Sequence, residues 1–297
     1  MHVGAAMFFT DYAMAPGALA QALEARGFES VWAPEHSHIP LSRRSPYPPG
    51  GDLPKQYYDA MDPFVSLTAA AAATTRLRIG TGVALVVQRD PIQTAKQVAS
   101  LDQISGGRFL FGVGAGWNAE EMADHGTTDF KGRHKLMRER IEAMRAIWTD
   151  EPAEYHGETV DFGPMIARPR PMQRPHPPVI VGGAFPYGAR RALRYGDGWI
   201  PHATRPQYDD VTAFMPEFRL MAEAAGRDPA SVPVTVFGPR EDAERLKSWR
   251  DAGVARVVVS LPAAGPEVVL PILDRWAGIM RVLAEPPRSP TVASAQS

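Results

Sequence analysis

The feature that most constrains the fold of this chain is an alternation of short apolar runs with segments of helical periodicity. The apolar runs have the length and composition of strands that are covered on both faces. Eight strand–helix repeats favour a closed barrel over an open sheet, so we predict an α/β fold, a (β/α)8 TIM barrel. Its strands are expected at 1–9, 31–33, 78–83, 108–114, 179–183, 198–201, 234–237 and 256–260. Its helices are expected at 16–26, 62–75, 91–104, 186–195, 207–225, 240–252 and 266–283.

The alternation is interrupted once, between about residues 117 and 176. This stretch holds a helix near 133–148, a hairpin near 153–162 and a proline-rich segment. We interpret it as an insertion between the fourth and fifth strands and not as a second domain, because a single barrel typically takes about 250 residues plus insertions. Residues 1–285 are then one domain, and the polar tail 286–297 is expected to be disordered.

Composition excludes several classes of function. The formal net charge is −1, from 32 Lys and Arg against 33 Asp and Glu, which gives no general attraction to nucleic acid or to an anionic membrane. There is no cysteine, hence no disulfide, thiolate metal site or thiol nucleophile. No apolar run approaches the 18 residues of a membrane span, and no basic leader precedes the first strand. We therefore expect a soluble cytoplasmic enzyme.

The second predicted strand runs directly into an acid and two imidazoles. Pro34 cannot continue a central ladder, so the strand should end there and place Glu35 and His36 at its carboxyl end. In an α/β barrel that rim is where active sites are built. The alternative is a surface ion pair without function. A zinc site through His36 and His38 is disfavoured, because the last strand ends without an acid, and we expect no metal.

Glycines follow two other predicted strands. The run 112–117 includes Ala115, Gly116 and Trp117, and glycine there lets a planar ring or a phosphate approach the backbone. It lacks the spacing of a dinucleotide fingerprint. The segment 80–83, with Gly82 and Val83, either forms a bulge or presses a strained peptide against a ligand.

A third glycine segment follows the fifth strand. Gly182 and Gly183 precede the beginning of a helix near Phe185, and that helix carries Arg190 and Arg191. Free N–H groups at such a helix end form an anion site. We therefore expect these residues to bind a phosphate; the alternative is an ordinary loop with solvated arginines.

Taken together, these residues resemble the luciferase-like flavin and deazaflavin oxidoreductases, also called the luciferase-like monooxygenase family. The resemblance covers about residues 1–285. It rests on the segments 32–36, 78–83, 101–108, 112–118 and 182–199. It implies a TIM barrel with the cofactor ring in its C-terminal mouth.

The branch that looks closest uses coenzyme F420, a 5-deazaflavin. That resemblance implies that His36 exchanges the proton that accompanies hydride transfer, with Glu35 beside the ring. It also implies a non-proline cis peptide at Gly82–Val83 and a homodimer. Sugar dehydrogenases of this branch carry an acid where this chain has Trp117, which instead would form the floor of an apolar substrate pocket. We expect residues 35, 36, 82, 83, 116 and 117 to line one pocket.

The function expected is hydride transfer between F420 and a small organic substrate, bound by the rim loop 41–60 and the insertion. Two alternatives stay open. One is an FMN-dependent luciferase-like monooxygenase that uses O₂, and the other is a non-catalytic flavin- or deazaflavin-binding protein. Histidine suits proton exchange at neutral pH, which favours an enzyme over a binding protein.

Overall fold

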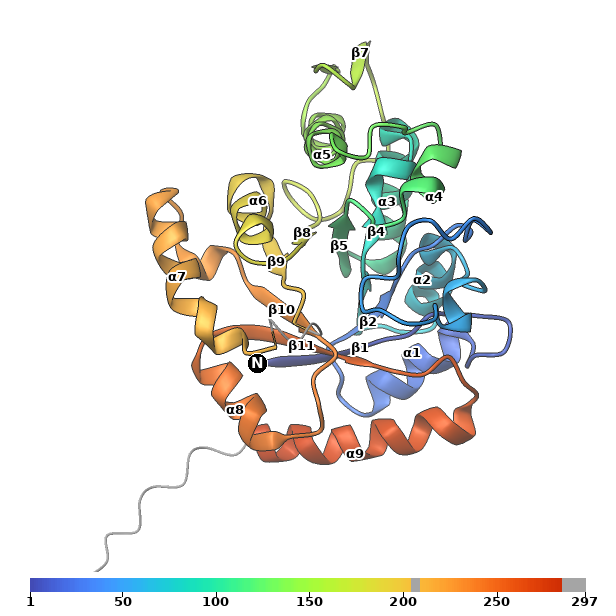
Figure 1. The fold of residues 1–297 in the computed structure, drawn as a ribbon, viewed down its shortest axis with the longest axis vertical. Helices are drawn as coiled ribbons and strands as arrows, with labels where there is room; N and C mark the ends of the chain where they lie inside the picture. The colour runs from blue at the N-terminus through green and yellow to red at the C-terminus, as the bar shows by residue number, and fades with distance from the viewer. Residues whose placement is uncertain (204–208, 285–297) are drawn as a thin grey trace, which may run out of the picture.

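The strands form a closed parallel barrel. The computed structural model describes residues 1–203 and 209–284. Neighbouring strands follow the order β3, β2, β1, β11, β10, β9, β8 and β5, and the pairing of Ile79 with Phe109 joins β3 to β5 and closes the ring. The predicted TIM barrel is confirmed (Figure 1). The barrel strands are β1 His2–Ala6, β2 Ser30–Ala33, β3 Arg78–Thr81, β5 Phe109–Gly114, β8 Val179–Gly182, β9 Gly198–Ile200, β10 Val234–Phe237 and β11 Val254–Ser260.

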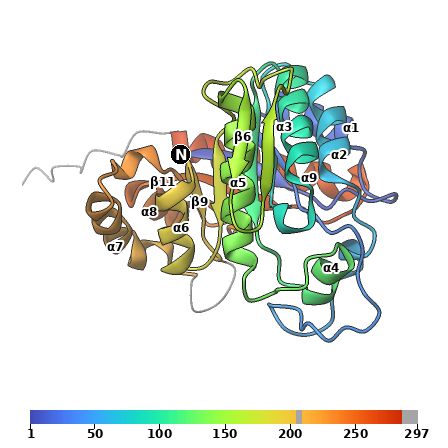
Figure 2. The same cartoon turned by 90° about the horizontal axis from the view of Figure 1, so that it is seen from above.

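Helices cover the outside of this barrel (Figures 1 and 2). Their beginnings follow from sequence: Asp62 and Asp90 each stand before a proline and accept hydrogen bonds from N–H groups of the first turn of α2 and of α3. Gly106, with φ 67°, ends α3 in a left-handed conformation that suits glycine. The outer helices are α1 Pro16–Ala25, α2 Pro63–Ala72, α3 Pro91–Ser105, α5 Arg133–Thr149, α6 Tyr187–Tyr195, α7 Val211–Ala224, α8 Ala243–Asp251 and α9 Pro266–Ala284.

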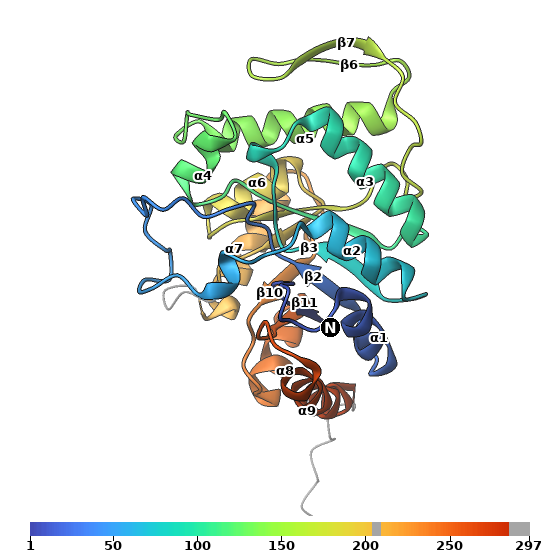
Figure 3. The same ribbon diagram turned by 90° about the vertical axis from the view of Figure 1, so that its right-hand side faces the viewer.

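The insertion is smaller than predicted. Helix α5 lies beside α3, and the Trp148 ring packs against Phe111 of β5, so α5 serves as the fourth helix of the barrel. The short helix α4 Ala119–Asp124 lies between β5 and α5. What remains as an insertion is the hairpin of β6 Ala153–His156 and β7 Asp161–Met165, which lies outside α5 (Figure 3). Periodicity alone did not distinguish a helix of the barrel from a helix of an insertion.

The barrel interior is filled around one indole. Trp32 is fully buried and lies with Ala6, Leu110, Ile180, Ile200 and Val258 in a cluster separate from the core under the helices. A Cβ on Gly80 of β3 would lie 2.5 Å from the Trp32 ring, and one on Gly4 would lie 3.1 Å from its Nε1. Glycine at position 80 therefore makes room for a neighbouring side chain. The sequence predicted either a bulge or a strained peptide for the segment 80–83. Neither explains Gly80, which is explained by its contact with the Trp32 ring.

The segment after β3 has a further irregularity. The Gly82–Val83 peptide is cis, as predicted, and β4 Ala84–Leu85 follows it and pairs with β5.

The rim loop 41–60 contains one short 3-10 helix, η1 Lys55–Tyr57. The predicted tail 286–297 and the predicted beginning of α7 at Gln207 lie outside the described residues. In the part of the chain that the structure describes, no helix is long and apolar enough to cross a membrane.

Candidate active site

His36 is held by a buried carboxylate at the carboxyl end of β2. Its Nδ1 lies 2.8 Å from Oε2 of Glu121, and only 6% of the His36 side chain and none of the Glu121 side chain is exposed. Burial would raise the pKa of the Glu121 carboxyl, but the hydrogen bonds from His36 and from the Ser37 N–H outweigh it and hold that pKa below its ordinary value. Glu121 is therefore a carboxylate that fixes the orientation of the His36 ring through Nδ1.

Aromatic rings cover the other side of this imidazole. The Tyr57 centroid lies 5.3 Å and the Trp117 centroid 5.6 Å from the His36 ring. Tyr47 packs edge-on against both Tyr57 and Trp117. The rim loop, η1 and the end of β5 thus bring their aromatic residues together over His36. A planar organic molecule placed against these rings would be shielded from water.

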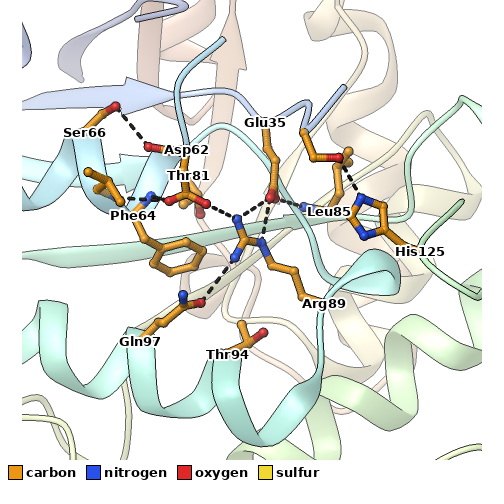
Figure 4. A network of polar contacts seen from close by, with 12 residues as sticks. Glu35, Asp62, Phe64, Ser66, Thr81, Leu85, Arg89, Thr94, Gln97 and His125 are labelled. Atoms are coloured by element: carbon orange, nitrogen blue, oxygen red, sulfur yellow. Dashed lines mark hydrogen bonds and ion pairs between the residues drawn. The ribbon is translucent and has the colours of Figure 1, made fainter. Parts of the chain in front are cut away.

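Glu35 points into a different network (Figure 4). Its Oε2 accepts a hydrogen bond of 2.6 Å from the Leu85 N–H, and its Oε1 accepts one of 2.6 Å from Nε of Arg89. The same guanidinium reaches Asp62 at 2.6 Å and Gln97 at 3.2 Å. Both oxygens of Glu35 are engaged, which favours a positioning role for this residue over the catalytic role beside the cofactor ring that the resemblance implies. The pair ties the end of β2 to β4 and α3.

A pocket of about 410 Å³ opens beside this network. Two of the six residues expected to share one cavity, Glu35 and His36, are in its wall, whereas the other four are not. Its lining consists of Glu35, His36, Ser37, Ala60, Asp62, Pro63, Gln88, Arg89, Asp90, Gln93, Thr94, Gln97 and His125. This pocket therefore lies on the α2–α3 side of His36, and the aromatic rings lie on the other.

The remaining residues of the predicted ring site lie at the same end of the barrel. The Gly82 N–H donates to the Ala33 carbonyl at the end of β2. Val83 is half-buried and, with Phe237, packs on the interior cluster around Trp32. Gly116 has φ 68°, which suits glycine, and Ala115 is buried in the core. Gly82 and Val83 thus cover the interior of the barrel at the rim that carries His36.

The rim loop is fastened by a second carboxylate. Glu120 of α4 accepts hydrogen bonds from Ser42 Oγ at 3.0 Å, from the Arg44 N–H at 2.7 Å, and from both the N–H and the hydroxyl of Ser45. Burial would raise the pKa of Glu120, but these bonds, those from Ser45 first, lower it to about 2. The loop lies beside α4 in Figures 2 and 3. Glu120 and Glu121 therefore hold the loop and the imidazole from one turn of helix.

A cationic cluster lies beside the Gly182–Gly183 segment. A Cβ on Gly183 would lie 2.9 Å from Nη2 of Arg191, so this guanidinium reaches the glycine. Burial lowers the pKa of Arg191, and burial together with the charge of Arg191 lowers that of Arg133. His134 is neutral at pH 7, because burial and these two arginines lower its pKa to about 4.

This cluster has donors without acceptors. In the part of the chain that the structure describes, Nε of Arg191, Nε of Arg133 and Nδ1 of His134 are buried without a hydrogen-bond partner. Buried cations are normally paired, because an unpaired buried charge is costly. An anion beside Gly183 would supply the missing acceptor, so these residues fit the phosphate of a flavin or deazaflavin cofactor.

Two residues predicted for the phosphate site lie elsewhere. Arg190 is exposed, and its Cζ lies 5.8 Å from the centroid of the Tyr187 ring. The Phe185 ring stacks on Phe214 of α7 at 5.2 Å, so its side chain packs in the core. The structure thus gives Arg191, and not Arg190, the place beside Gly183.

Several residues of the site were missed from the sequence. Asn118 caps α4, and its side chain accepts a hydrogen bond of 3.2 Å from the Glu121 N–H. An Asn followed three residues later by a Glu is typical of a helix N-terminus, so this spacing could have predicted an acid at the rim. Arg89, Arg133 and His134 carried no such signal, because their partners come from distant elements. Among the described residues, no group of three His, Asp or Glu side chains is placed to hold a metal ion.

Comparison with known proteins relates the chain to one family over most of its length. A family model described as luciferase-like monooxygenase matches residues 14–257. An uncharacterized protein of Mycobacterium tuberculosis is 41% identical over 286 residues, which cover 93% of this chain and 98% of that protein. The F420-dependent hydroxymycolic acid dehydrogenase of the same organism is 31% identical over 215 residues, which cover 72% of this chain and 55% of the dehydrogenase.

A solved structure supports the fold independently. Monooxygenase RslO1 from Streptomyces bottropensis matches with a TM-score of 0.76 at 23% identity, covering 95% of this chain and 99% of that one. The barrel and the family model agree. The chain belongs to the luciferase-like monooxygenase family.

Proposed function

We propose that this protein is an F420-dependent oxidoreductase that transfers hydride between the deazaflavin and a small organic substrate. The observation that carries the proposal is the buried pair of His36 and Glu121 under the aromatic rings at the barrel rim. An imidazole held by a carboxylate in a water-poor site is suited to giving and taking one proton. The similarity to an F420-dependent dehydrogenase supports the choice of cofactor.

Residues at the two ends of the site have different proposed roles. Arg191 and Arg133 would hold the cofactor phosphate beside Gly183. Trp117 and Tyr57 would orient the planar parts of cofactor and substrate and exclude water. When bound, the deazaflavin supplies the hydride chemistry. His36 holds or releases the proton at Nε2 or Nδ1, and Glu121 stabilises its charged form.

Purification followed by mass and absorbance of the small molecule that co-purifies tests the cofactor directly. Fluorescence titration of the protein with F420 and, separately, with FMN gives the two dissociation constants. Gly183→Asp should abolish binding of the preferred cofactor, since it adds bulk and a carboxylate beside Arg191, which would pair with the guanidinium and repel the phosphate. Tight binding of FMN and O₂-dependent turnover would replace the proposal by the monooxygenase function. Binding without turnover of a panel of ketones, alcohols and enones would leave a cofactor-binding protein.

We also propose a homodimer. Large apolar side chains are exposed on α2 and α3, with Val65 71% exposed and Ile104 55% exposed. Such side chains on adjacent helices are typical of a surface that a second copy covers. Sedimentation equilibrium of the wild type and of Val65→Lys tests this, and a monomeric wild type would contradict it.

A further inference from the structure

A chain of polar groups leads from buried His36 to the protein surface. Oε2 of Glu121 lies 2.8 Å from His36, and its other oxygen, Oε1, lies 3.4 Å from the Ser37 hydroxyl. That hydroxyl lies 2.6 Å from Nε2 of His125 and 2.9 Å from Nδ1 of His38. Imidazole, carboxylate, hydroxyl and imidazole therefore follow one another within hydrogen-bond distance.

The outer end of this chain is in contact with solvent. Ser37 and His125 are exposed, and 40% of the His38 side chain is exposed. Nε2 of His38 lies 2.9 Å from Oδ2 of Asp124, a carboxylate that is 58% exposed. Histidine is the residue type suited to proton exchange near neutral pH, so these two imidazoles at the surface can exchange protons with buffer and water.

Among residues 1–203 and 209–284, the opposite side of His36 offers no comparable chain of polar groups. The rings of Tyr57 and Trp117 lie against it, and Trp117 has no acidic group. Burial, followed by the hydrogen bond with Tyr47, raises the pKa of the Tyr57 phenol, so Tyr57 does not carry protons near neutral pH. The aromatic side is therefore closed to the proton, which leaves the Glu121 side and the wall of the 410 Å³ pocket as the routes from His36 to water.

We propose that Glu121, Ser37, His125 and His38 form a relay that moves protons between His36 and solvent. The role of the relay in turnover rests on the proposed function, whereas proton exchange between His36 and solvent along the relay does not. Ser37, His38 and His125 are positioning residues that act through His36.

Each step of the relay moves one proton and leaves no charge behind. Outward, the Nδ1–H bond of His36 breaks as an O–H bond forms on Oε2 of Glu121. After rotation of the protonated Glu121 carboxyl, its O–H bond breaks as an O–H bond forms on Ser37 Oγ, while the original Ser37 O–H bond breaks and its proton goes to Nε2 of His125, which leaves Glu121 a carboxylate again. His125 then releases a proton to water. His38 offers a parallel last step, with Asp124 stabilising its charged form.

The exchange rate of the His36 ring N–H with water measures the relay without cofactor or substrate. We expect ¹⁵N-histidine NMR to show that Ser37→Ala slows this exchange at least about tenfold, equivalent to about 1.4 kcal/mol of barrier. Ser248→Ala is the matched control, since Ser248 is an exposed serine on the outer helix α8. Unchanged His36 exchange in folded Ser37→Ala would overturn the relay, because water in the 410 Å³ pocket would then reach His36 directly.

A second variant tests the outer end. The double variant His38→Gln and His125→Gln should also slow the exchange, and millimolar free imidazole should restore it. His156→Gln is the control, because His156 is an exposed histidine on the distant hairpin. No slowing in the double variant, or slowing that imidazole does not relieve, would overturn the part given to these histidines. Slowed exchange in a protein that turns over no substrate would refute the proposed function and leave the relay in place.

Discussion

Replacing Glu120 with glutamine should release the rim loop from α4. In the folded protein the pKa of Glu120 falls from an ordinary 4.5 to about 2. At about 1.4 kcal/mol per tenfold change in proton affinity, this difference corresponds to about 3 kcal/mol in favour of the closed loop. Glutamine keeps one acceptor oxygen but loses the charge, and neutral hydrogen bonds are about half as strong as charge-assisted ones. We therefore expect a loss of about 1.5–3 kcal/mol.

Amide hydrogen exchange reads this loss at two sites. The N–H groups of Arg44 and Ser45 donate to Glu120 at 2.7 Å and 3.1 Å, so they exchange only when the loop opens. At pH 7 their exchange should be about 10–100-fold faster in Glu120→Gln. Glu217→Gln, on an exposed position of α7, is the control and should change neither amide.

The pH dependence gives a second check with a definite sign. Because the folded pKa is depressed, the stabilisation is fully present above about pH 4.5 and is lost as the pH falls toward 2. Wild-type loop protection, corrected for intrinsic exchange, should fall over that window, and in Glu120→Gln it should not. Equal protection of Arg44 and Ser45 in both proteins at pH 7 would refute the fastening role of Glu120.

Three further changes test the rest of the site. His36→Ala should reduce turnover by about 10²–10⁴-fold and change the cofactor dissociation constant far less; weaker binding with an intact rate constant would contradict its proton role. Arg191→Met should weaken cofactor binding at least about tenfold in a fluorescence titration, whereas Arg190→Met should not, and equal losses would contradict the placement of the phosphate. Glu35→Gln should lower the free energy of unfolding in urea by about 3 kcal/mol, since it leaves Arg89 partly unpaired; an unchanged midpoint would show that Asp62 alone satisfies Arg89.

The barrel could be predicted because its strands are buried on both faces. The runs 31–33, 179–181 and 257–259 are continuously apolar and buried, which is typical of strands covered on both faces. The helix beginnings at Asp62–Pro63 and Asp90–Pro91 could be predicted from local sequence, because an aspartate before a proline is typical of a helix N-terminus. The role of α5 was not, because whether a helix packs on the barrel depends on partners such as Phe111 that the sequence does not name.

The site was predictable only as far as it follows strand ends. His36, Gly82 and Gly183 were found because each comes directly after a strand. Their partners were not: Glu121 comes from the α4 segment, and Arg89 comes from the turn before α3. Charge pairs between distant elements carry no periodic signal, so the sequence did not predict the ion pair of Glu35 with Arg89.

The indole at the centre of the barrel also limits how this protein can change. The Trp32 ring occupies the volume that a side chain at position 80 would need, so the sizes of the two residues depend on each other. A single-site scan would score Gly80→Ala as damaging, because extra atoms in a filled interior typically cost about 1–3 kcal/mol. The same scan would score a smaller residue at 32 as damaging, because it leaves a void. A larger residue at position 80 combined with a smaller one at position 32 would keep the interior filled, and a scan of single substitutions does not test this combination. Libraries that reshape the barrel interior should therefore vary both positions at once.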